Sequence, residues 1–367
     1  MEWYPLAFEP IMKKVLWGGS ALADFKQLPF DSPQTGESWE ISAVEGSVSL
    51  LGNGALKGKK LDELISLDPE GLLGSKVYEG YGADFPLLIK WIDTAADLSI
   101  QVHPDDAFAR TQGRRFGKTE LWYVVSAEPE ARLIAGFNKK LSREEYLRRI
   151  AENSIEEVLL QHPVQAGDVF MIPPGRVHSI GKGILLAEIQ QSSDITYRIY
   201  DFQRKDCRGN ARPLHTELAA QCLDFGHYTD YKTTYHRRLN QAVELNRNKY
   251  FRVNRLELKA GEPKSGEPKS GEPKSGEPKS GEPKSGDSKH QALVKAEKPL
   301  LEMERNPAGG KSFVVYMCLE GALELYCSNG SSGCLSRGRT LLIPAAAGSC
   351  LLQCKDAALV LEIFAEC

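Results

Sequence analysis

Several features that mark specialised classes of protein are missing from this chain of 367 residues. No stretch reaches the roughly 20 apolar residues that a membrane-spanning helix needs, and the longest apolar runs have the length of strands. The acidic, aromatic start is not followed by the apolar segment of a secretory signal, so we expect a cytoplasmic protein. With 46 Lys and Arg against 49 Asp and Glu, the charge gives no reason to expect a nucleic acid or a membrane as partner.

Cysteine is present but lacks the spacing of a metal site. No two of the eight cysteines form a C-x-x-C pair, so a structural zinc–thiolate site is not expected. Disulfide frameworks are typical of small secreted chains, and this chain is neither small nor visibly secreted. We therefore expect reduced, mostly buried thiols.

Short strands dominate the pattern that is present. Clusters of Gly and Asn separate brief apolar stretches. One helix is expected from Ser142, which forms a capping-box pattern with Glu145 and is followed by a helical apolar period up to Leu159. A mainly β chain with few helices predicts a barrel core. The strands are expected at residues 86–92, 97–103, 121–125, 132–137, 169–172, 184–190, 251–258, 313–319 and 357–364.

A tandem repeat interrupts the C-terminal third. The pentapeptide Gly-Glu-Pro-Lys-Ser occurs five times without change from Gly261 to Ser285. It offers no apolar residue except proline, and proline opposes both helix and sheet pairing. We expect a flexible loop between two strands, and a recognition role for this tract is the less favoured interpretation.

A second, fainter repeat indicates two barrels of one kind. Gly167–Pro173 resembles Gly338–Pro344, and both follow a run of expected strands. Ser349 stands in the second copy where His178 stands in the first. The second barrel is therefore expected to lack the chemistry of the first.

Four residues form a plausible set of metal ligands. Gln101 and His103 lie two apart on the polar face of one expected strand, so their side chains project the same way. Glu120 opens the next strand, and His178 ends a proline-glycine turn. Two imidazole nitrogens and two oxygens suit Zn²⁺ or another divalent first-row metal, with a position left open for substrate or water. Singly, each residue is more often solvated or hydrogen-bonded, but together with the P-x-G-x-x-H turn they resemble the site of cupins.

The chain resembles the type I mannose-6-phosphate isomerases, in their short bacterial form. The resemblance runs in order over residues 1 to about 220 and is weak beyond 240. The motifs that carry it are Trp17–Gly19, Gly36–Ser42, Leu98–Pro104, Gly117–Trp122, Pro173–His178 and Tyr197–Phe202.

This resemblance implies a fold, a cofactor and a reaction. The fold is mainly β, with two cupin-like, jelly-roll barrels and a few helices. The cofactor is one zinc ion held by Gln101, His103, Glu120 and His178. The reaction is the reversible aldose–ketose isomerisation of mannose 6-phosphate and fructose 6-phosphate, with a phosphorylated sugar as the partner.

Together with the internal repeat, the resemblance gives a division into domains. Residues 1–240 are expected to form the catalytic cupin domain with helical decoration. Residues 241–367 are expected to form a degenerate cupin-like domain, with the repeat loop at 261–285 inside it.

The same resemblance assigns roles around the metal. Arg198, in a Tyr-Arg-x-Tyr-Asp string, is the first choice for a residue that stabilises enediolate oxygens, because its charge is fixed. Glu188 is a candidate base, although a structural strand glutamate is nearly as good an interpretation. Lys118 and Ser99 are candidates for binding the phosphate, and Lys118 is also a candidate catalytic residue.

Two other functions stay open on the sequence. A metal-dependent cupin oxygenase would usually hold Fe(II) with two or three histidines, and Gln101, Lys118 and Arg198 argue against it. A sugar-phosphate-binding regulator descended from the isomerase is the other alternative, and it need not keep the ligand set.

Overall fold

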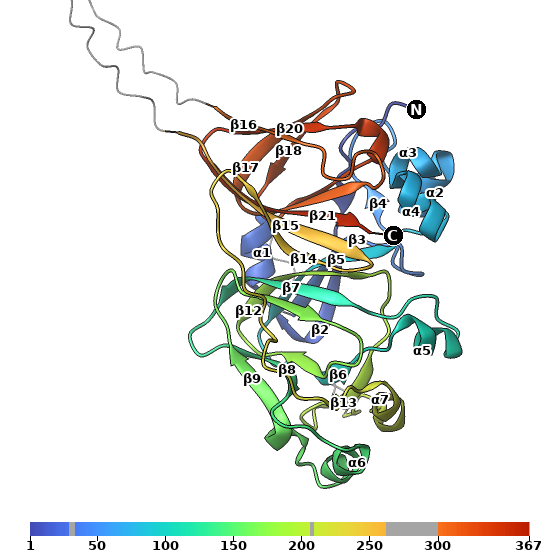
Figure 1. Ribbon diagram of the computed structural model, residues 1–367, viewed down its shortest axis with the longest axis vertical. Coiled ribbons are helices and arrows are strands. Elements are labelled where there is room, and N and C mark those ends of the chain that lie inside the picture. The colour runs from blue at the N-terminus through green and yellow to red at the C-terminus, as the bar shows by residue number, and fades with distance from the viewer. Residues whose placement is uncertain (29–33, 206–208, 262–299, 367) are drawn as a thin grey trace, which may run out of the picture.

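The computed structural model describes residues 1–28, 34–205, 209–261 and 300–366. The chain is mainly strands arranged in two stacked barrels, with few helices (Figure 1). The expected repeat loop at 261–285 lies outside the described residues, apart from Gly261 itself.

Two antiparallel sheets form the first barrel. Apolar side chains from both sheets meet between them, among them Trp17, Ile92 and Trp122 from one sheet and Leu133 and Ile180 from the other. In spatial order, the six-stranded sheet contains β10 (Val169–Ile172), β7 (Glu120–Ala127), β12 (Ile184–Gln191), β5 (Leu87–Thr94), β2 (Ile11–Gly19) and β3 (Thr35–Ile41). The five-stranded sheet contains β13 (Tyr197–Tyr200), β6 (Ile100–Val102), β11 (His178–Ile180), β8 (Arg132–Phe137) and β9 (Leu159–Pro163).

A single long strand organises the second barrel. β17 (Val314–Cys327) pairs with β21 (Ala357–Ala365) along its first half and with β20 (Cys350–Cys354) along its second half, so the sheet curls around its own apolar face. The remaining strands are β14 (Ala242–Arg247), β15 (Phe251–Lys259), β16 (Leu301–Arg305), β18 (Ser332–Ser336) and β19 (Thr340–Ile343).

A satisfied polar network sits inside this second barrel. The carboxylate of Glu362 is fully buried. It accepts hydrogen bonds from Arg305 at 2.9 and 2.6 Å, from the Tyr316 hydroxyl at 3.0 Å and from Asn254 Nδ2 at 2.8 Å. Four hydrogen bonds from three neighbours hold the buried charge at low cost.

The largest apolar core lies between the barrels rather than inside either one. The alternation of strand side chains sends Trp122 and Val124 of β7 into the first barrel and Leu121 and Tyr123 toward the second. Leu361 of β21 belongs to the same shared core. The central strands β7, β12 and β5 of the six-stranded sheet are therefore packed against apolar cores on both faces.

The internal repeat corresponds to equivalent strands. β10 and β19 begin at equivalent places in the two copies, and β11 begins at His178 while β20 begins at Cys350, directly after Ser349. The two-barrel, mainly β fold expected from the sequence is confirmed.

The expected helix begins correctly and ends earlier than the pattern predicted. The Ser142 hydroxyl accepts a hydrogen bond from the Glu145 amide at 3.1 Å, which caps α6 (Arg143–Ala151). Asn153 then adopts a left-handed φ of 53°, which ends the helix before the short 3-10 turn η1 (Ile155–Val158). The other short elements are β1 (Phe8–Glu9), α1 (Ala21–Lys26), β4 (Leu50–Leu51), α2 (Leu61–Leu67), α3 (Pro69–Leu73), α4 (Ser75–Tyr81), α5 (Asp106–Thr111), α7 (Thr216–Cys222) and η2 (Ala345–Ala347).

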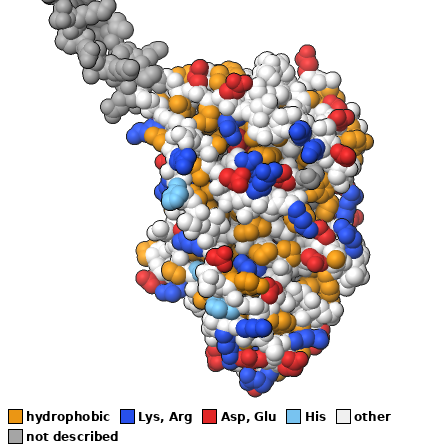
Figure 2. All heavy atoms as spheres, in the orientation of Figure 1, with side chains coloured by type: hydrophobic (Ala, Val, Ile, Leu, Met, Phe, Trp, Pro, Cys, Tyr) orange, Lys and Arg blue, Asp and Glu red, His pale blue; other side chains and the backbone are white. Residues whose placement is uncertain are grey.

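The six cysteines in the described ranges are free thiols, and four of them are buried. Cys207 and Cys367 lie outside those ranges. Acidic and basic side chains are interspersed on the face that Figure 2 shows. Within the same ranges, no helix has both the length and the apolar character to cross a bilayer.

Candidate metal centre and substrate pocket

Three buried side chains converge at one end of the first barrel. Glu120 is the first residue of β7, His178 is the first residue of β11, and His103 directly follows β6. β6 and β11 are neighbours, with Gln101 opposite His178, whereas β7 comes from the facing sheet. The space between the two sheets therefore receives ligand-type atoms from both.

The distances within this cluster are those of groups that share one centre. His103 Nε2 lies 3.1 Å from His178 Nε2. The two oxygens of Glu120 lie 3.5 Å from His103 Nε2 and 3.4 Å from His178 Nε2. Gln101 Nε2 lies 3.3 Å from His178 Nε2, so an amide turned about its terminal bond presents its oxygen to the same centre. The structure brings together all four residues that the sequence suggested as ligands.

The chemistry of the cluster fits a bound cation. Neither Glu120 oxygen accepts a well-formed hydrogen bond within the described part of the chain, although Lys118 Nζ lies 2.9 Å from Oε2. His178 Nδ1 lies 2.8 Å from the Arg176 carbonyl, which places the ring proton on Nδ1 and leaves the lone pair of Nε2 facing the cluster. Two imidazoles and a carboxylate are a typical ligand set for zinc.

Burial sets the protonation of these groups. It lowers the pKa of His178 to about 3 and that of His103 well below its usual value, and the charge of Lys118 lowers both further. Both rings are thus neutral, which is the form that binds metals. Burial also raises the pKa of Glu120 to about 7, a trend that the nearby Lys118 charge opposes.

The turn before His178 needs its glycine. Gly175 has a φ of 83°, and its amide donates to the His103 carbonyl at 2.9 Å, so the turn is tied to the first histidine. A Cβ at this position would lie 2.9 Å from the Cys222 carbonyl oxygen. The proline-glycine sequence thus fixes where β11 begins and where His178 points.

A pocket of about 350 Å³ opens beside the cluster. Its lining includes five of the residues that the sequence put forward for ligation, catalysis or phosphate binding: Ser99, Gln101, Lys118, Glu188 and Arg198. Residues far apart in the chain therefore meet in one cavity, and Gln101 is the candidate metal ligand among its lining residues.

Lys118 lies beside the candidate metal ligands as well as in the pocket lining. Its Nζ is 2.9 Å from Glu120 Oε2 and 3.2 Å from His103 Nε2, and the side chain is buried. It precedes β7 by two residues and lines the pocket. Its charge is therefore next to the candidate ligands Glu120 and His103 as well as in the pocket.

Arg198 faces the pocket from β13. Its Nε donates to Ser99 Oγ at 3.3 Å, and Nη1 donates to the Pro213 carbonyl at 3.0 Å. Asp201, three residues after Arg198, instead accepts 2.5 Å hydrogen bonds from Arg204 and Arg212. Arg198 thus keeps a charge that a ligand in the pocket can use.

Glu188 is buried on β12 and doubly anchored. Trp122 Nε1 donates to Oε1 at 3.0 Å, and Lys90 Nζ lies 2.8 Å from Oε2. Burial alone would favour the neutral acid, but the charges of Lys90 and Lys118 lower the pKa of Glu188 to about 2. The carboxylate is therefore ionised throughout the neutral range.

Sequence reasoning missed Lys90 and Trp122 as parts of this pocket. Lys90 sits in the middle of the apolar stretch Leu87–Ile92, and its aliphatic stem and ammonium are buried against Glu188. A lysine inside the otherwise apolar stretch Leu87–Ile92 was the available signal, because such a charge needs a buried partner.

Comparison with known proteins agrees with this geometry. Residues 6–131 match the family model of the phosphomannose isomerase type I catalytic domain. A mannose-6-phosphate isomerase of Streptococcus mutans is 45% identical over 224 residues, which are 60% of this chain and 68% of the relative. The chain belongs to the mannose-6-phosphate isomerase family.

Two further comparisons extend this assignment to the second barrel. The Bacillus subtilis family member ManA is 38% identical over 257 residues, covering 69% of this chain and 79% of that protein. The crystal structure of a mannose 6-phosphate isomerase from Bacillus subtilis superposes with a TM-score of 0.77 at 28% identity, over 99% of both chains. The family fold thus includes both barrels.

Proposed function

We propose that this chain interconverts mannose 6-phosphate and fructose 6-phosphate as a zinc-dependent aldose–ketose isomerase. One observation carries the proposal: His103, Glu120, His178 and Gln101 converge on one centre at the wall of a pocket that also holds Lys118 and Arg198. The relatives named above carry the same activity in their names.

Four residues would hold the zinc ion, namely Gln101, His103, Glu120 and His178. The bound metal would supply an electrophile for the sugar oxygens near the reacting carbons. Neutral imidazoles, and a carboxylate that accepts no well-formed hydrogen bond from the described residues, support this choice.

The remaining polar residues suit the two ends of a sugar phosphate. An aldose–ketose isomerase moves a proton between C1 and C2 and stabilises the negative charge that develops on the oxygens. Arg198 holds a fixed positive charge in the pocket for such an oxyanion, and Ser99 beside it offers a hydroxyl. Lys118 offers a second cation for the phosphate or for the oxyanion.

Glu188 is the candidate proton-transfer base. It is ionised, as a base must be, and it lines the pocket. The same bonds to Lys90 and Trp122 that keep it ionised also weaken its basicity. Its role is therefore the part of the mechanism that most needs a direct test.

A coupled assay with mannose 6-phosphate tests the proposal. The purified protein is assayed as isolated, after chelation and after zinc is added back. We expect turnover that the chelator abolishes and zinc restores. A protein that holds stoichiometric zinc and still fails to turn over mannose 6-phosphate would refute the isomerase assignment and favour a sugar-phosphate-binding regulator.

Two coarser expectations belong with this proposal. We propose that residues 1–240 form the catalytic domain and residues 241–367 a domain without catalytic ligands, because Ser349 stands at the position of His178. We also propose a cytoplasmic location, since phosphorylated sugars are the expected substrates, and cell fractionation tests it.

A further inference from the structure

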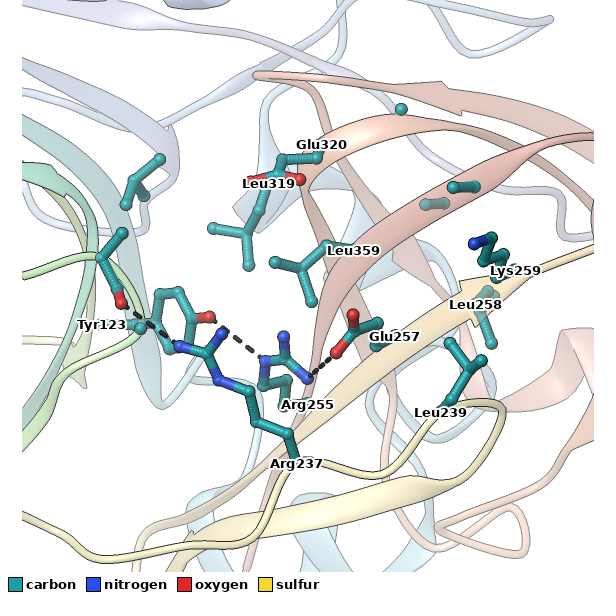
Figure 3. Close-up of a pocket in the computed structure, with 16 residues that line it drawn as sticks. Tyr123, Arg237, Leu239, Arg255, Glu257, Leu258, Lys259, Leu319, Glu320 and Leu359 are labelled. Carbon is teal, nitrogen blue, oxygen red and sulfur yellow. Dashed lines mark hydrogen bonds and ion pairs between the residues drawn. The ribbon is translucent and has the colours of Figure 1, made fainter.

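A second cavity lies on the opposite side of the six-stranded sheet from the metal cluster. Its volume is about 350 Å³, and its lining comes from β7, the segment before β14, and strands β15, β17 and β21 (Figure 3). Tyr123 lines this cavity, whereas its neighbour Trp122 lines the substrate pocket. Since successive side chains of a strand point to opposite faces, one sheet separates the two cavities.

The cavity contains a buried arginine. The Arg255 side chain is only 3% exposed. Its Nε lies 3.3 Å from the Tyr123 hydroxyl, and Nη1 lies 2.8 Å from Glu257 Oε2. Figure 3 shows its third nitrogen directed toward Leu319 and Leu359, with no interaction drawn to the residues in that view. One face of the guanidinium fork therefore points into the cavity.

A second arginine reaches the same side of the cavity. Arg237 Nη2 donates to the Ala166 carbonyl at 3.3 Å, and its side chain lines the same cavity as Arg255 (Figure 3). A Cβ at Gly167 would lie 2.3 Å from Arg237 Nη2, so the glycine leaves the room that this guanidinium occupies. Two guanidinium groups that line one cavity both attract an anion placed in it.

The rest of the lining suits a ligand that also carries hydroxyls. Lys259 adds a third cation on the far side, and Glu257 and Glu320 add two carboxylates that accept hydrogen bonds. Leu239, Leu319 and Leu359 supply apolar surface. The described lining thus carries three cations and two carboxylates, and its volume lies at the lower end of the range for small-molecule sites.

We propose that this cavity between the barrels binds a small polyhydroxylated organic phosphate, with the phosphate held by Arg237 and Arg255. Paired arginine forks match the geometry of a phosphate, and the carboxylates accept from the hydroxyls. This site is separate from the metal centre and does not depend on the proposed isomerase activity.

Hydrogen–deuterium exchange of the full chain tests the proposal, because it localises binding. The probe is ribose 5-phosphate, compared with ribose and with inorganic phosphate. We expect ribose 5-phosphate to slow exchange in residues 232–240 and 251–259, ribose to have no effect there, and inorganic phosphate to act only at higher concentration. Protection of the β6 and β13 segments alone, an equal effect of ribose, or equal potency of inorganic phosphate overturns the proposal.

Variants connect the protection to the arginines. Arg237→Gln replaces an exposed guanidinium by a neutral amide. We expect it to raise the ribose 5-phosphate concentration needed for protection by roughly tenfold or more. Arg255→Gln is expected to act in the same direction. Arg252→Gln is the matched control, because Arg252 lies on the other face of β15 and pairs with Glu244. Unchanged binding in Arg237→Gln, or equal losses in Arg237→Gln and Arg252→Gln, refutes the site. Since neither readout uses turnover, an inactive enzyme leaves this test intact.

Discussion

Lys118 Nζ lies 2.9 Å from Oε2 of Glu120, so a candidate phosphate-binding lysine adjoins a candidate metal ligand. A cation this close to a ligand carboxylate affects both the metal centre and any anion in the pocket. The proposed phosphate-binding and metal-binding residues are therefore electrostatically linked.

The first prediction concerns this lysine. Lys118→Met is expected to raise the KM for mannose 6-phosphate by roughly tenfold or more, because a charge-assisted hydrogen bond to an anion is lost. Steady-state kinetics with zinc content measured in parallel checks it. Lys139→Met, which removes an exposed lysine paired with Glu145, is the control. An unchanged KM would remove Lys118 from the substrate site.

Removing one imidazole should remove the metal. His178→Ala is expected to lose bound zinc and turnover together, since Nε2 of His178 faces the other ligands. Elemental analysis and the coupled assay give the two readouts. His227→Ala, whose ring instead bonds the Phe137 carbonyl, should retain both. Full zinc occupancy in His178→Ala would count against ligation by this residue.

The role of Glu188 can be separated from its packing. Glu188→Gln keeps the shape and an oxygen for Trp122 but cannot accept a proton, so a base role predicts a fall in kcat of roughly 10²-fold or more with little change in KM. Exchange of the substrate C2 proton with solvent should fall in parallel. A kcat within a few-fold of the wild type would leave Glu188 only its structural pairing with Lys90.

The core shared by the barrels predicts a large stability effect away from the site. Leu361 is fully buried there, so Leu361→Ala is expected to lower the free energy of unfolding by about 2–5 kcal/mol. Denaturant titration measures this change, and Leu214→Ala, at a side chain 47% exposed, serves as the control. Because the core belongs to both barrels, they should unfold in one transition; two separate transitions would contradict this.

The repeat at 261–285 should be dispensable. Deleting it shortens the connection between β15 and β16, which end and begin at Lys259 and Leu301. Loop-closure entropy changes by less than about 1 kcal/mol for such a shortening, so activity and Tm are expected to stay close to those of the full chain. A large loss of either would show that the repeat packs or acts.

Local patterns predicted part of the set of strands, because each of those strands depends on a few neighbouring residues, whereas β2, β3, β9 and β14 were not among the expected strands. β8 and β10 have the bounds that alternation and turns gave them. The candidate ligands could also be predicted from the sequence. Gln101 and His103 share one face of an expected strand. Glu120 opens the next strand, and His178 ends the proline-glycine turn. β6 is shorter than its pattern, because only Ile100–Val102 pairs with neighbours.

Pairings across long distances in the chain were not predictable from such patterns. Nothing local shows that Lys90 faces Glu188, or that Leu121 and Tyr123 pack against a second barrel. The sequence around Arg255 likewise does not indicate its contact with Tyr123, which lies 132 positions earlier in the chain. These relationships depend on which faces of the sheets meet.

The network around Glu362 bears on how a two-barrel enzyme can change over evolutionary time. In the first barrel the buried Glu120 accepts no well-formed hydrogen bond from described residues. In the second barrel the buried Glu362 already accepts hydrogen bonds from Arg305, Tyr316 and Asn254. A new metal site there would require losing the arginine and gaining ligands, and each single step would leave a buried charge unpaired. The interior of the second barrel thus opposes the gain of a metal site there.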